Sequence, residues 1–100
     1  MKLVLSPAAI NDLQSIANYT FRTWGAEQES LYLAALWRRL EAIRASPEAH
    51  RIRKDLAIHC RSARHEKHVI FFSVEDGEIE VIRILHGAMD FESQLPDEPG

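Results

Sequence analysis

Cysteine is nearly absent from the sequence, since Cys60 is the only one in 100 residues. A single cysteine excludes an internal disulfide, and no zinc-site spacing of cysteines and histidines is present. No repeat, linker or low-complexity segment divides the chain. At this length, with 46% hydrophobic residues, there is room for one core. We therefore expect one domain over residues 1–95 and a disordered tail at 96–100.

Long apolar runs and a secretory leader are also missing. No run of hydrophobic residues is long enough to span a bilayer. Met1 and Lys2 lead directly into a short predicted strand, without the apolar segment of a signal peptide. We therefore expect a soluble, cytoplasmic protein that makes no contact with a membrane.

An excess of positive charge is missing as well. The formal net charge is −3 and the pI is near 5.9, whereas proteins that grip nucleic acid phosphates are usually basic. We therefore expect no direct binding of nucleic acid. The charge is uneven, however, with six bases against two acids over residues 51–67, and eight acids against one base from residue 75 onward. These regions are either solvated surface or a docking face for an acidic partner.

The motifs of common enzyme and cofactor sites do not occur. The sequence has no nucleophile elbow, phosphate loop, dinucleotide fingerprint or metal motif, so we expect no cofactor and no metal. His65 and His68 are three residues apart, but they flank the start of a predicted strand instead of sharing a helix face. We interpret them as ordinary loop and strand-edge residues.

A β-hairpin is the strongest structural signal in the chain. Two runs rich in Val, Ile and Phe, His68–Val74 and Ile79–Leu85, enclose the dipeptide Asp76-Gly77. Asp-Gly between two such runs indicates a tight turn, because glycine adopts positive φ freely and aspartate tolerates it. Neither run alternates between apolar and polar residues, which is typical of central strands covered on both faces.

A pair of helices is predicted before this hairpin. Ser6-Pro7 is a helix start, because serine caps the first turn and proline fits the first helical position. Gly25 ends this helix, and a second helix runs from about Ala26 to Ala45, where Ser46-Pro47 stops it. The first helix has one apolar stripe at helical spacing, made by Leu13, Ile16, Ala17, Thr20 and Trp24. We interpret both tryptophans and Tyr32 as packing residues.

Two further strands are predicted outside the hairpin. Lys2–Leu5 is a short strand, and Leu56, Ile58 and Cys60 alternate with more polar residues up to Arg61, which indicates a strand with one apolar face. The segment from Ser62 to Lys67 is then a turn. The order strand, helix, helix and three strands predicts a two-layer α+β domain, with a helical hairpin on a mainly antiparallel four-stranded sheet.

One face of this sheet is expected to lack a cover. The helix pair can cover only one face, yet the hairpin places apolar side chains on both. The uncovered face would carry some of Val69, Phe71, Val81 and Leu85, with Arg83 on the side of Val81 and Leu85. An uncovered apolar patch predicts a binding partner.

Four residues form the only candidate catalytic set: Arg61, Arg64, Arg83 and His86. Arginines beside a histidine can bind a phosphate and transfer protons in RNA cleavage. Strand alternation opposes a tight cluster, because Arg83 and His86 are three residues apart and point to opposite faces. The alternative is that Arg61 and Arg64 are solvated, Arg83 pairs with a carboxylate and His86 lies at a strand end.

The chain resembles the ParE toxins of the RelE/ParE superfamily of bacterial type II toxin–antitoxin systems. The resemblance extends from Lys2 to Leu95. It rests on the order of elements, on the opening LVLSPAAINDLQSIANYTFRTWG and above all on VIRILHGAMD, from Val81 to Asp90.

This resemblance implies a toxin that inhibits DNA gyrase without being an enzyme. It also implies a ParD-type antitoxin, whose disordered C-terminal segment folds around the toxin and buries a large surface. On this basis we expect the antitoxin interface to include Arg61, Arg64, Phe71, Val81, Arg83 and Leu85.

Two alternatives remain open at this level. The RelE branch of the superfamily cleaves mRNA on the ribosome, and Arg61, Arg83 and His86 would then be the catalytic residues. No tyrosine follows Arg83, since Met89-Asp90-Phe91 stands there, and the chain is acidic overall. The other alternative is a non-toxic module that only binds the antitoxin.

Overall fold

The computed structural model describes residues 1–87 and 89–95. The prediction of a disordered tail at 96–100 lies outside these residues. The elements are β1 (Lys2–Leu5), α1 (Pro7–Trp24), α2 (Ala26–Ala45), the short 3-10 helix η1 (Pro47–Ala49), β2 (Arg61–His65), β3 (His68–Glu75), β4 (Glu78–His86) and α3 (Phe91–Gln94).

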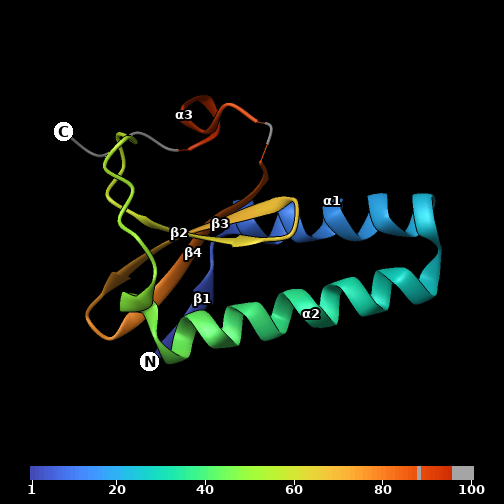
Figure 1. Ribbon diagram of the computed structural model, residues 1–100, viewed down its shortest axis with the longest axis horizontal. Coiled ribbons are helices and arrows are strands. Elements are labelled where there is room, and N and C mark those ends of the chain that lie inside the picture. Colours follow the sequence, from blue (N-terminus) through green and yellow to red (C-terminus); the bar gives the residue numbers. More distant parts are fainter. Residues whose placement is uncertain (88, 96–100) are drawn as a thin grey trace.

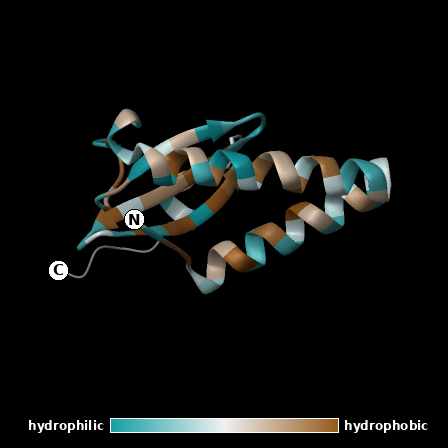
Figure 2. Cartoon of the chain, turned by 90° about the horizontal axis from the view of Figure 1, so that it is seen from below, coloured by the Kyte–Doolittle hydropathy of each residue, from teal (hydrophilic) through white to brown (hydrophobic). Residues whose placement is uncertain are grey.

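A four-stranded sheet in the order β1-β4-β3-β2 forms one layer, and the α1–α2 hairpin forms the other (Figure 1). β2, β3 and β4 are an antiparallel meander, and β1 joins the free side of β4 in parallel. In Figure 2 the central strands are mostly hydrophobic, while the helices alternate between hydrophobic and hydrophilic residues. The predicted two-layer α+β fold is confirmed.

The helical hairpin begins and turns at the predicted residues. The Ser6 hydroxyl accepts a hydrogen bond from the Ala9 N–H at 3.0 Å and donates to the Ile82 carbonyl at 2.7 Å, so it caps α1 and ties it to β4. Gly25, with φ of 93°, separates the two helices. A side chain is disfavoured at this backbone conformation, which is the physical reason for glycine at the turn.

The β3–β4 hairpin has the predicted tight turn and one irregularity. Asp76 and Gly77 both have positive φ, 51° and 73°, as this kind of turn requires. A β-bulge shifts the register, so that Phe71 pairs with Arg83 while Phe72 pairs with Val81. An extra residue in one strand changes which face later side chains occupy. The prediction that Arg83 shares a face with Val81 was therefore wrong.

The main core lies between the sheet and the helical hairpin. It combines buried residues of α1 and α2 with one face of the sheet, namely Ala9, Ile16, Leu36, Leu40, Ile43, Ala63, Ile70, Phe72, Ile79, Val81 and Ile84. Burial of these apolar side chains is the main favourable contribution to folding.

The opposite face of the sheet is also covered, contrary to the prediction. A second cluster buries Cys60, Val69, Phe71, Ile82, Leu85 and Leu95, with Leu56, Ile58 and Phe91 packed against it. The cover is supplied by the loop before β2 and by α3, which lies across the sheet from the helical hairpin (Figure 1). Phe71 and Leu85 are at most 2% exposed, so no open apolar face remains at these residues.

The strand before the hairpin is shifted from its predicted position. Residues 56–60 are a loop, and β2 is Arg61–His65, the segment that was expected to be a turn. Leu56, Ile58 and Cys60 all belong to the second cluster. Their alternation therefore reports burial on one side of a loop, which a period of two cannot distinguish from strand pairing.

The end of the helical hairpin extends beyond the sheet (Figure 1). Trp24 is 67% exposed and Trp37 is 44% exposed, so the prediction that both tryptophans are packing residues was wrong. Helical spacing marks one face of a helix correctly, but burial also needs something beneath that face. At Trp24 the sheet has already ended.

Candidate functional site

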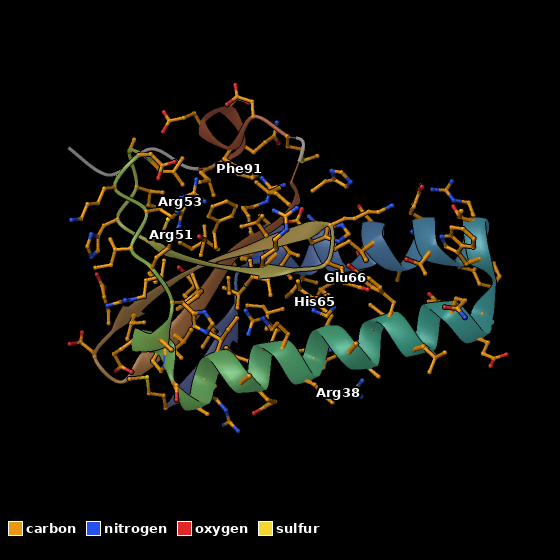
Figure 3. All side chains as sticks on the ribbon, in the orientation of Figure 1. Arg38, Arg51, Arg53, His65, Glu66 and Phe91 are labelled. Atoms are coloured by element: carbon orange, nitrogen blue, oxygen red, sulfur yellow. The ribbon has the colours of Figure 1, made fainter. Side chains whose placement is uncertain are left out.

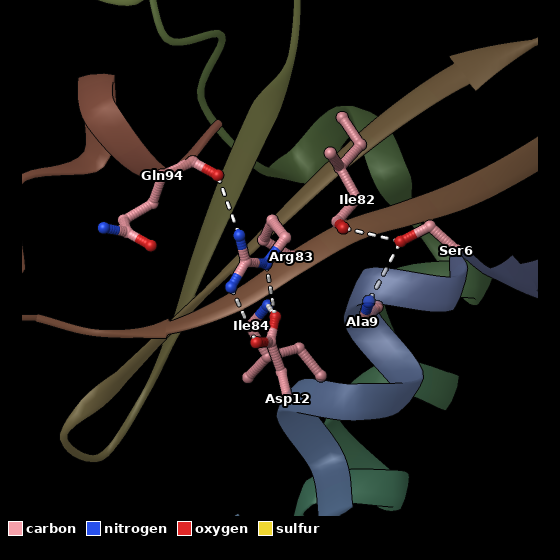
Figure 4. A network of polar contacts seen from close by, with 7 residues as sticks. All are labelled: Ser6, Ala9, Asp12, Ile82, Arg83, Ile84 and Gln94. Atoms are coloured by element: carbon pink, nitrogen blue, oxygen red, sulfur yellow. Dashed lines mark hydrogen bonds and ion pairs between the residues drawn. The ribbon is translucent and has the colours of Figure 1, made fainter. Parts of the chain in front are cut away.

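Arg83 is held in a network that joins three elements (Figure 4). Its Nε lies 2.7 Å from Asp12 Oδ2, its Nη2 lies 2.8 Å from Asp12 Oδ1, and its Nη1 donates to the Gln94 carbonyl at 2.8 Å. The Ile84 N–H donates to the same Asp12 carboxylate at 2.9 Å. The hydrogen bonds to Asp12 raise the pKa of Arg83. The guanidinium thus connects α1, β4 and α3, which fits the alternative of an arginine paired with a carboxylate.

Arg61 lies on the other face of the sheet and has a different partner. Its Nη1 donates to the His50 carbonyl at 2.7 Å, and it pairs in register with Phe72, one position away from the Phe71–Arg83 pair. Successive pairs in a sheet point to opposite faces. Arg61 and Arg83 are therefore separated by the sheet itself.

Arg64 lies near the end of β2, one residue before its last position. Its Nε donates to the Glu66 carbonyl at 3.1 Å, and a side chain on Gly87 would place its Cβ only 3.3 Å from the Arg64 guanidinium. Gly87 therefore allows a close approach that a larger residue would disturb. Arg64 pairs with Val69, while His86 pairs with His68, so these two candidates are also on opposite faces.

The four candidate catalytic residues are not brought together. Arg61 and His86 share the helix-covered face, but their partners on β3, Phe72 and His68, are four residues apart, or about 13 Å along the strand. Proton transfer needs groups within hydrogen-bond reach of one reacting atom. The four side chains are too far apart to reach one reacting atom.

A row of three histidines crosses the sheet at its other end, a feature not predicted from the sequence. His65, His68 and His86 are register partners on β2, β3 and β4. The Tyr32 hydroxyl from α2 lies 2.7 Å from His68 Nδ1, and the His68 and His86 rings are 5.7 Å apart. Burial raises the pKa of Tyr32 to about 12 and lowers that of His68, which neighbouring His86 lowers further. Both pKa shifts favour the neutral forms of the Tyr32 hydroxyl and the His68 ring.

The histidine row does not make a metal site. Over residues 1–87 and 89–95, no three side chains of His, Cys, Asp or Glu are placed to hold a metal ion. The signal available in the sequence was the register itself, because a two-residue turn after His65 places His65 opposite His68. The predicted turn from Ser62 to Lys67 was too long, because β2 continues to His65.

A basic surface surrounds β2. Arg39 of α2 donates from Nε to the Arg64 carbonyl at 3.1 Å, and Arg51 lies on the segment that leads to β2 (Figure 3). Arg53 is different, because it binds both oxygens of Asp55 and lies 5.5 Å over the Phe71 ring. That hydrogen bonding lowers the pKa of Asp55 to about 2. Arg53 thus belongs to the cover of the second cluster.

Large apolar side chains are exposed at the end of the helical hairpin. Tyr19, Phe21, Trp24 and Leu31 are each more than half exposed. We call these four residues the hairpin tip. Large apolar side chains that stay exposed on a small domain can gain burial by contact with another protein.

Comparison with known proteins decides the family. Residues 3–91 match the sequence profile described as the ParE toxin of the type II toxin–antitoxin system, parDE. The chain belongs to the ParE toxin family. The resemblance expected from VIRILHGAMD is thereby confirmed.

Curated ParE toxins align with this chain over nearly their whole length. Toxin ParE of Escherichia coli is 35% identical over 95 residues, which cover 94% of this chain and 92% of the relative. Toxin ParE1 of Mycobacterium tuberculosis (strain H37Rv) is 32% identical over 95 residues, covering 94% and 97%. Toxin ParE1 of Caulobacter vibrioides is 32% identical over 91 residues, covering 91% and 94%.

A solved structure supports the ParE fold independently. A chain described as the chromosomal ParDE TA system from P. aeruginosa superposes with a TM-score of 0.76, over 86% of this chain and 95% of that one. The identity is 19%, so this likeness concerns the fold.

The ParE assignment also bears on the chemistry. This family supports a toxin that acts by binding rather than as an enzyme. The dispersed positions of Arg61, Arg64, Arg83 and His86 agree with that conclusion. Among the described residues, no helix is long and apolar enough to cross a membrane.

Proposed function

We propose that this ParE-family toxin inhibits DNA gyrase in the cytoplasm and is neutralised by a ParD-type antitoxin. The match of residues 3–91 to the ParE family carries the proposal. The structure adds the hairpin tip, where exposed aromatic side chains can gain burial from a protein partner. No catalytic residue in the toxin is required by this function.

Two of the basic residues predicted for the antitoxin interface lie in accessible positions on the toxin. Arg64 is exposed, and Arg61 is half-buried on the opposite face of β2. An acidic partner that contacts both must therefore reach around the edge of this strand. Phe71, Val81 and Leu85 are buried within the toxin. Contact with Phe71 or Leu85 requires the partner to displace α3 or the loop before β2, and contact with Val81 requires it to part the helices from the sheet.

A gyrase assay with the purified toxin tests the target. We expect loss of supercoiling and accumulation of cleaved DNA, and we expect prior incubation with the antitoxin to restore supercoiling. The control is the Leu36→Ala variant, which removes a buried core side chain and should lose inhibition together with folding. A folded toxin that leaves gyrase unaffected at high concentration overturns the gyrase proposal.

A further inference from the structure

β2 is the outer strand of the sheet beside β3, so its far side is an edge. The residues of an edge strand turn their backbone groups alternately toward the neighbour and toward the outside. The Ser62 N–H donates outward to the Arg51 carbonyl at 3.2 Å, which places the groups of Ser62 and Arg64 on the open side.

The two halves of this edge are covered in different ways. Backbone covers the first half, because Ile52 bridges to Arg61 and the Arg53 N–H donates to the Cys60 carbonyl at 2.8 Å. Side chains cover the second half, where the carbonyls of Arg64 and Glu66 accept from the guanidiniums of Arg39 and Arg64 at 3.1 Å each. No backbone segment among residues 1–87 and 89–95 pairs with Arg64 on this side. These arginine side chains can rotate away from the Arg64 and Glu66 carbonyls without any change in the fold.

The charge at the second half of the edge is positive. Arg39, Arg64 and Lys67 are at or beside it, with Glu66 as the acid of the turn. Basic side chains on an edge oppose pairing between two copies of the same chain. The same side chains attract a strand that carries carboxylates.

The other edge of the sheet is a natural comparison. β1 also has an open side, but its neighbours in register include Glu78 and Glu80, both exposed. An acidic strand added beside β1 would meet these like charges. β1 itself carries one base, Lys2, which is the register partner of Glu78. The β2 edge, with Arg39, Arg64 and Lys67, therefore suits an acidic segment better than the β1 edge does.

We propose that the second half of the β2 edge, residues 63–66, accepts an extended acidic segment of the antitoxin as a fifth strand, which rests on the proposed antitoxin partnership. The Arg64 N–H donates to a carbonyl of that segment, and the Arg64 carbonyl accepts from one of its N–H groups. Arg39 leaves the Arg64 carbonyl and pairs with a carboxylate of the added strand. Backbone pairing then supplies affinity, and the arginines select the acidic sequence.

Amide hydrogen exchange on the toxin, alone and in complex with purified antitoxin, tests the pairing directly. We expect the Arg64 amide to exchange at least about tenfold more slowly in the complex, while the Leu3 and Leu5 amides on the β1 edge keep their rates. A complex in which Arg64 gains no protection overturns the fifth strand and leaves the antitoxin partnership intact. Failure to form any complex overturns both.

Charge reversal tests the selection of an acidic segment. The Arg39→Glu/Arg64→Glu double variant should bind the antitoxin at least about tenfold more weakly, whereas Arg22→Glu on the exposed side of α1 should bind as the unmodified toxin does. Circular dichroism of the double variant confirms that it is folded. Unchanged affinity of the folded double variant overturns the role given to the arginines.

Discussion

At the scale of single residues, charged groups in this toxin serve the fold more than they serve chemistry. Arg83 was the most conspicuous candidate in the sequence, because it interrupts an apolar strand. The structure gives it a partner on α1 and another on α3, with the arginine and aspartate side chains only 20% and 13% exposed. A charge in such a place stabilises the fold only while its partner is present.

Removal of Asp12 should therefore be costly. The Asp12→Ala variant leaves the Arg83 guanidinium without its carboxylate and the Ile84 N–H without its acceptor. We expect the free energy of unfolding to fall by about 1–3 kcal/mol, measured from urea midpoints. The matched control is Glu41→Ala, which breaks the exposed Arg44–Glu41 pair and should cost about 0.5 kcal/mol or less. Equal effects of the two variants would contradict this account of Arg83.

Glu66 is a residue whose backbone conformation affects stability more than its side chain does. It has φ of 53° in the turn between β2 and β3, where a residue with a Cβ is disfavoured. We expect Glu66→Gly to raise the free energy of unfolding by about 0.5–1 kcal/mol. Glu75→Gly, in the β3 strand, is the control and should lower it. A lower midpoint for Glu66→Gly would show that the turn is not strained.

At the scale of elements, the contact between α2 and the sheet favours the neutral form of His68. His68 is half-buried under Tyr32 and is flanked by His65 and His86 on the neighbouring strands. Asp12 and Glu66 oppose its loss of charge, but burial and the two histidines outweigh them, so its pKa is lowered in the folded chain. Protonation would place positive charge under a helix that packs on this row.

The stability of the toxin should therefore decrease in mild acid. Because the pKa of His68 is lower in the folded than in the unfolded chain, the unfolded chain takes up the proton first as the pH falls. Its contribution is fully present above the unfolded pKa of about 6.5 and is lost as the pH falls through that value toward the folded pKa. Urea midpoints between about pH 5 and pH 8 measure the loss.

His68→Gln is the variant that isolates this effect, since glutamine can accept a hydrogen bond from Tyr32 but does not titrate. We expect the midpoint of this variant to vary less with pH than that of the unmodified toxin. His50, whose pKa burial also lowers, contributes with the same sign and is examined separately as His50→Gln. If His68→Gln keeps the full pH dependence, the histidine row is not its source.

At the scale of the whole molecule, the two ends of the sheet carry opposite charge. The β2 side holds Arg39, Arg51 and Arg64. The turn between β3 and β4 and the strand ends beside it carry Glu75, Asp76, Glu78 and Glu80. The modest net charge of −3 hides this separation. Long-range fields of this kind accelerate encounters with a complementary partner.

Association with the antitoxin should consequently depend on salt. Raising the sodium chloride concentration from about 50 mM to about 500 mM shortens the Debye length, so we expect the association rate constant to fall by about tenfold or more. Surface plasmon resonance gives the association and dissociation rates separately, and the dissociation rate should change less. An association rate that is insensitive to salt would contradict steering by the basic surface.

Much of the fold was accessible from local patterns. The Ser6-Pro7 start, the Gly25 break and the Asp76-Gly77 turn each act over a few residues, so residue type predicts them. The position of β2 was missed, because alternation at Leu56, Ile58 and Cys60 reports one-sided burial in a loop as well as in a strand. The exposure of Trp24 was missed because it depends on where the sheet ends.

The identity of this chain as a ParE-family toxin and its β-α-α-β-β-β order were already contained in the amino-acid sequence. Motif, capping and turn signals are local, and family resemblance is a property of residues in order. Three features could not be read from the sequence. They are the closing of the second sheet face by α3, the change of face at the bulge before Arg83, and the contact of Arg83 with Asp12. Each joins segments distant in sequence, and such contacts are set by the packing of the whole chain rather than by any one stretch of it.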